Sequence, residues 1–271
     1  MRRAAGLIGL VLGALPGVAL ACAAQAPMPG VGGEAVARYE VPVGSRTAAQ
    51  ITAAWFAGPV KYYPHGVLGD AVEASVLSVR GSGISPEGAD CVVTVTLGED
   101  HVFEDLTPRL VDLDGDGAAE VVAVRSHVAR GAQLAVYGMR DGAFGLIATT
   151  PYIGQRNRWL APVGAADLDG DGAVEIAFVD RPHLAKTLRI WRWQEGDLVE
   201  VGGFAGVSNH RIGENFISGG LRDCGAGPEM VLARGDWSGL LALRFDGSEV
   251  TSTPVAGAPD AEGFGAALSC S

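Results

Sequence analysis

The sequence has 271 residues, of which 48% are hydrophobic, so it can bury a full core as one large domain or two small ones. Its formal net charge is −11, and its 20 Lys and Arg residues form no dense cluster. Nucleic-acid binding is therefore not expected, because neutralising phosphates requires a basic surface.

The first 26 residues are predicted to be a secretory signal peptide. Arg2 and Arg3 precede a long uncharged apolar stretch, and small residues follow up to Ala26. A charged start, an apolar centre and an Ala-x-Ala exit are typical of such peptides. Two alternatives stay open: an uncleaved membrane anchor, since the stretch is just long enough to span a bilayer, and a lipid anchor on Cys22. We expect an exported protein, periplasmic or extracellular, with no membrane span once the signal is removed.

Export would permit disulfides. The mature chain keeps Cys91, Cys224 and Cys270, and it keeps Cys22 if cleavage falls just before that residue. Three cysteines allow at most one bridge and one free thiol. We expect a Cys224–Cys270 bridge that ties the C-terminus to the last repeat, with three reduced cysteines as the alternative, because connectivity cannot be read from sequence. No pair has the spacing of zinc ligands.

Two acidic strings mark an internal repeat. Residues 112–120 read DLDGDGAAE, and residues 167–175 read DLDGDGAVE, 55 residues later. Each string lies between short runs rich in Val, Ile and Leu. A repeat of this length indicates an array of similar structural units.

Degenerate copies of the same pattern end at Glu73 and Glu229, where most of the acidic residues are missing. We therefore divide residues 62–254 into four units, two intact and two degenerate. Residues 27–61 form an N-terminal segment available to complete a unit, and residues 255–271 form a closing segment.

Each unit contains short Val-, Ile-, Leu- and Tyr-rich runs separated by Gly, Asp and Asn, which favours β-strands. In the second unit we expect strands at 108–111, 119–124, 133–137 and 143–148, and in the third unit at 163–166, 174–179, 187–193 and 198–201. Residues 39–43 and, more weakly, 263–268 also read as strands. No helix is needed, and the best candidate for a short one is 47–56.

Four short strands per unit at a period near 50 are typical of β-propeller blades. A single blade cannot bury both of its faces, so neighbouring blades must stack. The predicted fold is all-β, a small propeller of four four-stranded blades, with five blades as the nearest alternative.

The acidic strings place carboxylates at positions 1, 3, 5 and 9, where they repel one another unless a cation lies among them. They begin like an EF-hand loop, but the EF-hand glutamate at position 12 is replaced by Ala123 and Phe178. Glycines at positions 4 and 6 allow the sharp turn that such a loop requires. An all-oxygen site suits Ca²⁺ better than zinc or Mg²⁺. The alternative is a solvated acidic turn without metal.

These loops resemble the FG-GAP/VCBS repeat family, the calcium-loop propeller repeats of integrin α subunits and of many bacterial secreted proteins. The family often ends its loop with Asp where this chain has Glu, and no FG-GAP tripeptide is evident. The resemblance implies two structural Ca²⁺ ions and none in the first and fourth units. Carried over by position, the ligands are Asp112, Asp114, Asp116, the carbonyl of Ala118 and Glu120 in one loop, and Asp167, Asp169, Asp171, the carbonyl of Ala173 and Glu175 in the other.

A set of polar residues recurs between the strands and would share one end of a ring, around its axis. A mixed patch of this kind suits a sugar, a peptide or an anionic ligand, and the alternative is that its members pair with one another inside the ring. These candidate ligand-binding residues are Arg158, Asp180, Arg181, His183, Lys186, His210, Arg211 and Glu214.

Two functions follow from these observations. The first is a non-catalytic, calcium-stiffened module that binds a protein or carbohydrate partner. The second is a secreted hydrolase or lyase that uses His210, Arg211 and Glu214. No G-x-S-x-G, H-E-x-x-H or P-loop motif is present, so no catalytic residue is assigned. If the polar residues prove to be paired with one another, none of them is free to act on a substrate, and the enzyme hypothesis loses its support.

Overall fold

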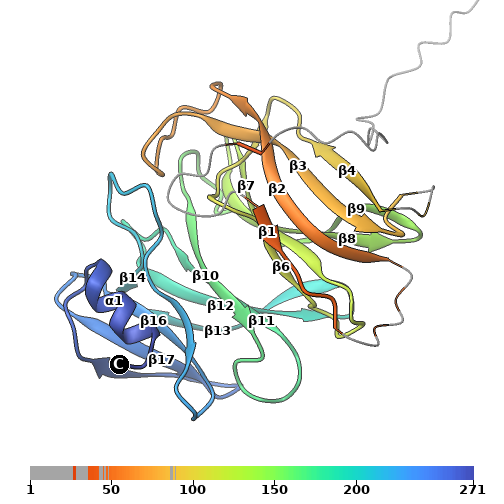
Figure 1. Ribbon diagram of the computed structural model, residues 1–271. Coiled ribbons are helices and arrows are strands. Elements are labelled where there is room, and N and C mark those ends of the chain that lie inside the picture. Colours follow the sequence, from red (N-terminus) through yellow and green to blue (C-terminus); the bar gives the residue numbers. More distant parts are fainter. Residues whose placement is uncertain are drawn as a thin grey trace, which may run out of the picture.

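The computed structural model describes residues 27–28, 36–42, 45, 47, 49–85, 88 and 90–271. Over these residues the chain forms antiparallel sheets and one short helix, so the all-β prediction is confirmed (Figure 1). The predicted signal peptide, including Cys22, lies outside the described residues. Within the described part of the chain, no helix is long and apolar enough to cross a membrane.

The strands group into four antiparallel meanders of four strands each, which we call meanders 1 to 4. Meander 1 consists of β1 (Val36–Arg38), β2 (Gln50–Val60), β3 (Glu73–Ser82) and β4 (Cys91–Thr96), paired in that order. Meander 2 consists of β6 (Arg109–Val111), β7 (Glu120–His127), β8 (Gly131–Arg140) and β9 (Ala143–Thr149). The short strand β5 (His101–Phe103) pairs with both β3 and β7 and joins the two meanders into one sheet.

Two further meanders form separate sheets. Meander 3 consists of β10 (Leu160–Ala166), β11 (Glu175–Asp180), β12 (Thr187–Gln194) and β13 (Asp197–Ala205). Meander 4 consists of β15 (Gly220–Asp223), β16 (Pro228–Arg234), β17 (Leu240–Phe245) and β18 (Val250–Val255), with β14 (Val207–Ser208) added beside β16. All eight strands predicted for the second and third repeat units are present, and most extend a few residues beyond the predicted range.

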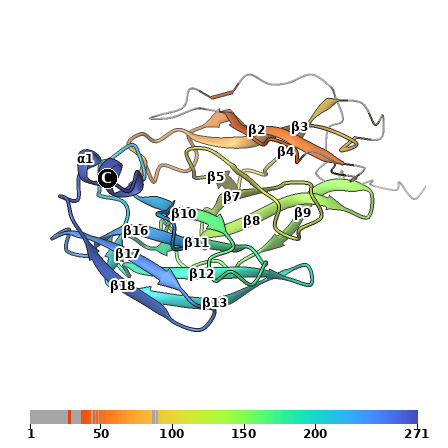
Figure 2. The same ribbon diagram turned by 60° about the horizontal axis from the view of Figure 1, so that its bottom comes forward.

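The meanders pack face to face because successive residues of a strand point to opposite faces. In β7, Val121 packs into the core shared with meander 1, whereas Val122 packs into the core shared with meander 3. In β11, Ile176 faces meander 2 and Ala177 faces meander 4. Meanders 2 and 3 are therefore buried on both faces. The four meanders follow one another along an arc (Figures 1 and 2).

The two ends of this arc are covered separately. The outer face of meander 4 is covered by helix α1 (Ala261–Leu268), whose Phe264 packs against Val231 and Leu240. The segment before β3 contacts the segment before β15, since a Cβ atom added at Gly69 would lie 3.0 Å from Asn215 Cβ.

Three local predictions are wrong. Residues 47–56 do not form a helix, because 50–60 form β2, whose burial on both faces hides the alternation expected of a strand. The described residues 39–42 are not in a strand, and β1 ends at Arg38. Residues 263–268 belong to α1, which begins after Asp260, whose side chain accepts a hydrogen bond from the Gly263 N–H.

The structure contains a disulfide between Cys224 and Cys270, the pair expected from the sequence. It ties the second residue after α1 to the loop between β15 and β16. Cys91 is disulfide-bonded as well, so the free thiol expected of the mature chain is not found among the described cysteines.

Candidate metal centres

Acidic loop 1 (residues 112–120) connects β6 to β7 and is shaped by its own first aspartate. The Asp112 carboxylate accepts hydrogen bonds from the Gly115 N–H (2.8 Å) and the Gly117 N–H (2.9 Å). Both glycines have positive φ, 75° and 90°, a conformation that costs glycine nothing. The loop therefore coils around Asp112 and turns its carboxylates toward a common point.

Glu120, the first residue of β7, closes this loop. Its Oε2 accepts the Leu113 N–H at 2.9 Å, while its Oε1 has no hydrogen-bond partner among the described residues. The side chain is 7% exposed. Burial, followed by the charges of Asp114, Asp116 and Asp112, raises the pKa of Glu120 to about 8. A largely buried carboxylate with one oxygen free of donors among the described residues, beside like charges, is an arrangement that a cation would stabilise.

Ligand atoms of Asp112, Asp114 and Glu120 lie within 4.8 Å of one another. Asp116 lies outside this group, and its Oδ1 accepts the Ala118 N–H at 2.7 Å. Three clustered carboxylates with one orphan oxygen fit a hard divalent cation such as Ca²⁺, which takes six to eight oxygen ligands at 2.3–2.6 Å.

Acidic loop 2 (residues 167–175) connects β10 to β11 and repeats this backbone geometry. Asp167 accepts the Gly170 N–H (2.7 Å) and the Gly172 N–H (3.0 Å), and Glu175 Oε2 accepts the Leu168 N–H (2.8 Å). Asp167, Asp169 and Glu175 again offer ligand atoms within 4.8 Å. Ala173 donates its N–H to Asp171 at 2.8 Å. The nearly identical sequences therefore fold into the same loop.

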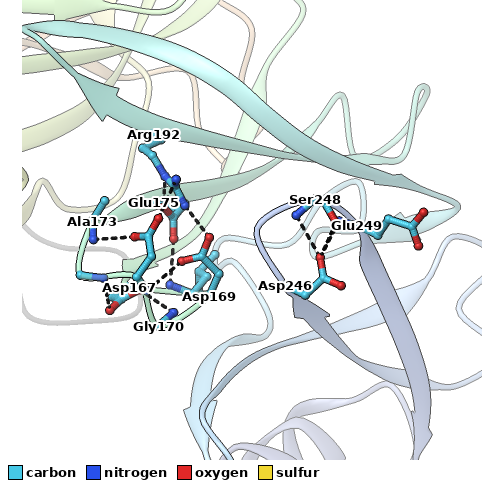
Figure 3. Close-up of polar contacts among 12 residues, drawn as sticks. Asp167, Asp169, Gly170, Ala173, Glu175, Arg192, Asp246, Ser248 and Glu249 are labelled. Carbon is cyan, nitrogen blue, oxygen red and sulfur yellow. Dashed lines mark hydrogen bonds and ion pairs between the residues drawn. The ribbon is translucent and has the colours of Figure 1, made fainter.

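The two loops differ in what surrounds their carboxylates. In loop 2 the guanidinium of Arg192, on β12, contacts Asp169 (2.6 Å), Asp171 (2.9 Å) and Glu175 (2.5 Å) (Figure 3). The Arg192 side chain is 15% exposed and the Glu175 side chain is fully buried. Burial raises the pKa of Glu175, but Arg192 opposes that increase. Loop 1 has no such arginine among the described residues.

Loop 1 also borders a cavity of about 950 Å³. Trp193 and Met139 contribute apolar surface, and the turns after β8 and β12 contribute charged groups. The charged residues that line the cavity are Asp114, Asp116, Glu120, Arg140, Asp141, Glu195 and Asp197. An ion held by loop 1 would therefore sit in the wall of an acidic cavity.

Comparisons with known proteins address the repeat directly. A family model described as an FG-GAP-like repeat matches residues 112–178, which is 67 of the 271 residues. Residues 112–178 are thus similar to an FG-GAP-like repeat. This match begins at loop 1, contains loop 2 and ends within β11, so the resemblance stated from the two loops is confirmed for this segment.

No curated protein matches the chain. Among solved structures, the chain is similar to a candidate 6-phosphogluconolactonase from Bacteroides fragilis NCTC 9343, with 15% identity and a TM-score of 0.41. That similarity covers 82% of this chain and 59% of the other protein. At this level the similarity supports no assignment of activity.

The polar residues expected at one end of a ring are only partly brought together. His183 Nε2 lies 2.9 Å from His210 Nδ1, and His210 Nε2 lies 3.0 Å from the Glu214 carbonyl oxygen. Burial and the neighbouring His210 lower the pKa of His183 to about 4. The Glu214 carboxylate accepts the Arg211 N–H at 3.1 Å. These groups form one internally paired cluster next to the FG-GAP-like repeat.

The remaining predicted residues have separate partners. Arg181 and Arg189 both bind the buried carboxylate of Asp180, at 2.8 and 3.1 Å, and thereby lower its pKa against the effect of burial. Lys186 Nζ donates to the Gly235 carbonyl at 2.6 Å. Arg158 donates to the Asn157 carbonyl at 3.0 Å. The Arg211 guanidinium donates to the carbonyl of Pro259 and lies over the Trp237 ring.

A second buried polar network was not predicted from the sequence. Glu104, fully buried beside the FG-GAP-like repeat, accepts hydrogen bonds from Ser126 and pairs with His65. Its backbone carbonyl accepts the Trp159 indole N–H at 2.8 Å. Glu104 is not at a position that recurs in the repeat units. The only sequence signal for its burial is that it directly follows the apolar end of β5.

Proposed function

We propose that the chain is an exported, calcium-binding β-propeller module that binds a carbohydrate or protein partner without catalysing a reaction. The observation that carries this proposal is loop 1, where Asp112, Asp114 and Glu120 offer ligand atoms within 4.8 Å of one another. One carboxylate oxygen of the largely buried Glu120 has no hydrogen-bond donor among the described residues. The match to the FG-GAP-like repeat begins at this loop.

In this proposal the four meanders are the four blades. Each has four antiparallel strands, and consecutive meanders bury apolar faces against each other. The close approach of Gly69 to Asn215 supports closure between the first and last blades. Helix α1 lies over the outer face of meander 4, so closure rests on loop contacts rather than on a fifth blade.

Calcium would have a structural role. Asp112, Asp114 and Glu120 would hold the ion, with Asp116 and the carbonyl of Ala118 as further oxygens on the same loop. The ion supplies positive charge that offsets the repulsion among these carboxylates and fixes the connection between β6 and β7. With ~1 mM external Ca²⁺ and a dissociation constant of ~0.1 mM, binding would add about 1.4 kcal/mol of stability.

The cavity beside loop 1 is the proposed ligand site. Its volume of about 950 Å³ is in the range of small-molecule sites. Trp193 offers an aromatic face and Arg140, Asp141 and Asp197 offer hydrogen-bonding groups, a combination that suits a hydroxyl-rich ligand such as a carbohydrate. A protein partner would instead have to insert a cationic side chain among these acids.

The enzyme alternative has weaker support. His183, His210, Glu214 and Arg158 all make internal contacts, so the residues proposed as reagents already have partners. A hydrolase or lyase would need these groups to face a bound substrate.

Calorimetric titration of the chelator-treated protein with Ca²⁺ alone tests the metal function, with Asp112→Asn expected to remove binding. Screening against oligosaccharides tests the ligand function. Trp193→Ala should weaken carbohydrate binding at least tenfold, whereas Trp237→Ala, a half-buried tryptophan outside the cavity, should not. Equal losses in both variants would contradict the cavity assignment. Mass spectrometry of the secreted chain's N-terminus tests export.

A further inference from the structure

The residue across the strand from the closing glutamate differs between the acidic loops. In meander 3, Glu175 on β11 pairs directly with Arg192 on β12. In meander 2, Val121 on β7 pairs with Tyr137 on β8. Extending this antiparallel register by one residue places Gly138 opposite Glu120. A Cβ atom added at Gly138 would lie 3.2 Å from Glu120 Cγ, which confirms that the two residues face each other. Two loops of nearly identical sequence thus have different cross-strand partners, an arginine in one case and a glycine in the other.

Arg192 occupies the carboxylate oxygens that an ion would require as ligands in loop 2. All three nitrogens of its guanidinium are used, with Nε on Glu175, Nη2 on Asp169 and Nη1 on Asp171. Guanidinium donors match carboxylates in a fixed planar geometry, and the group stays charged at any pH the fold tolerates. Because β12 anchors Arg192, the cation belongs to the chain and cannot diffuse away.

The surroundings of loop 2 leave little room to move this guanidinium aside. The Asp169 side chain is only 5% exposed. The turn between β17 and β18 lies against it, since a Cβ atom added at Gly247 would approach Asp169 Oδ2 to 2.8 Å (Figure 3). Loop 1 instead borders the open cavity, and its Glu120 Oε1 has no donor among the described residues.

Meander 4, whose acidic string is degenerate, also has an arginine at the position across from its closing glutamate. The pairing of Met230 with Leu243 continues to place Arg244 opposite Glu229. Arg244 contacts Glu229 at 2.7 Å, and Arg222 contacts the other carboxylate oxygen. Where an arginine stands at this position, it neutralises the closing glutamate.

We infer that Arg192 serves as the built-in counter-cation of acidic loop 2, so that this loop holds no calcium and the chain binds a single ion, at loop 1. This inference rests on the proposed calcium function and differs from the expectation of two ions. It also makes Arg192 and Gly138 the residues that decide whether an acidic loop of this chain accepts a metal.

The decisive experiment counts Ca²⁺ ions bound by the chelator-treated full chain, using calorimetry and equilibrium dialysis with Ca²⁺ alone. We expect one ion for the wild type and two for Arg192→Gln, which removes the charge and leaves a shorter, polar side chain. Asp167→Asn, added to Arg192→Gln, should remove the gained ion. Two ions in the wild type, or no gain in Arg192→Gln, would overturn the inference.

The failures of the two proposals are distinguishable. A wild type that binds no ion refutes the calcium function at loop 1, whereas one ion gained by Arg192→Gln would still support the role of Arg192. Arg192→Lys keeps the charge and should bind no additional ion, and Arg156→Gln, an exposed arginine, controls for the change in net charge.

A reciprocal variant keeps the test valid if Arg192→Gln folds poorly. Gly138→Arg should supply loop 1 with its own cation and abolish Ca²⁺ binding. A Cβ atom at Gly138 would lie 2.8 Å from Ile147 Cδ1, so Gly138→Arg is combined with Ile147→Val, which lacks that atom. Ile147→Val alone is the control and should still bind one ion. Retained binding in the double variant, with its fold intact by circular dichroism, would contradict the inference.

Discussion

Replacing Glu73 with glutamine should stabilise the protein increasingly as the pH rises. Glu73, the first residue of β3, is 5% exposed. Burial, followed by the charges of Glu104, Asp70 and Asp105, raises the pKa of Glu73 from 4.5 to about 9. The folded chain therefore keeps a proton on Glu73 over a pH range in which the unfolded chain releases it.

The size of the effect follows from proton linkage. Because the pKa of Glu73 is raised in the folded state, its carboxyl does not lower the free energy of unfolding below pH 4.5, where it is protonated in both states. As the pH rises from 4.5 toward 9, only the unfolded chain releases the proton, and the free energy of unfolding falls. Each pH unit in this window costs the folded state about 1.4 kcal/mol. Between pH 5 and pH 8 the loss approaches about 4 kcal/mol, an upper bound for this buried group. Glutamine, a neutral side chain of the same shape, has no such dependence.

The assay is urea denaturation of the wild type and of Glu73→Gln at several pH values between 5 and 8, all in the same concentration of Ca²⁺. The difference between the two free energies of unfolding should grow with pH. The other titrating groups are common to both proteins, so their contributions cancel and the difference reports Glu73 alone. Glu249→Gln, an exposed glutamate, should show no such growth. A constant difference between wild type and Glu73→Gln across the range would refute the reasoning.

Three further predictions concern the ion, the core and the disulfide. Asp112→Asn should abolish the increase in melting temperature that Ca²⁺ produces over a chelator, a contribution of about 1.4 kcal/mol in ~1 mM Ca²⁺, measured by thermal unfolding in both buffers. Leu188→Ala, at a fully buried position between meanders 3 and 4, should lower the free energy of unfolding by about 2–5 kcal/mol in denaturant titrations. Replacing both Cys224 and Cys270 with serine opens a link spanning 46 residues, and loop-closure entropy sets the expected loss at about 4 kcal/mol; an unchanged denaturation midpoint would contradict that role.

The regular elements of meanders 2 and 3 were predictable because their signals are local. Period-2 runs, glycine turns and the two acidic strings lie within a few residues of the structure they determine. Predictions failed where tertiary burial changed the pattern. Strand β2 is buried on both faces and lost its alternation, and α1 forms from a small-residue segment because meander 4 offers Phe264 and Ala267 a surface to cover.

The shape of each acidic loop follows from local interactions, since Asp112 and Asp167 organise the backbone within their own nine residues. The residue that faces each closing glutamate depends instead on the tertiary structure. Cross-strand pairing places Gly138 against one closing glutamate and Arg192 against the other, and strand register is set by the fold of the whole hairpin. Two nearly identical local signals therefore face different neighbours, because charge compensation depends on residues that are distant in sequence.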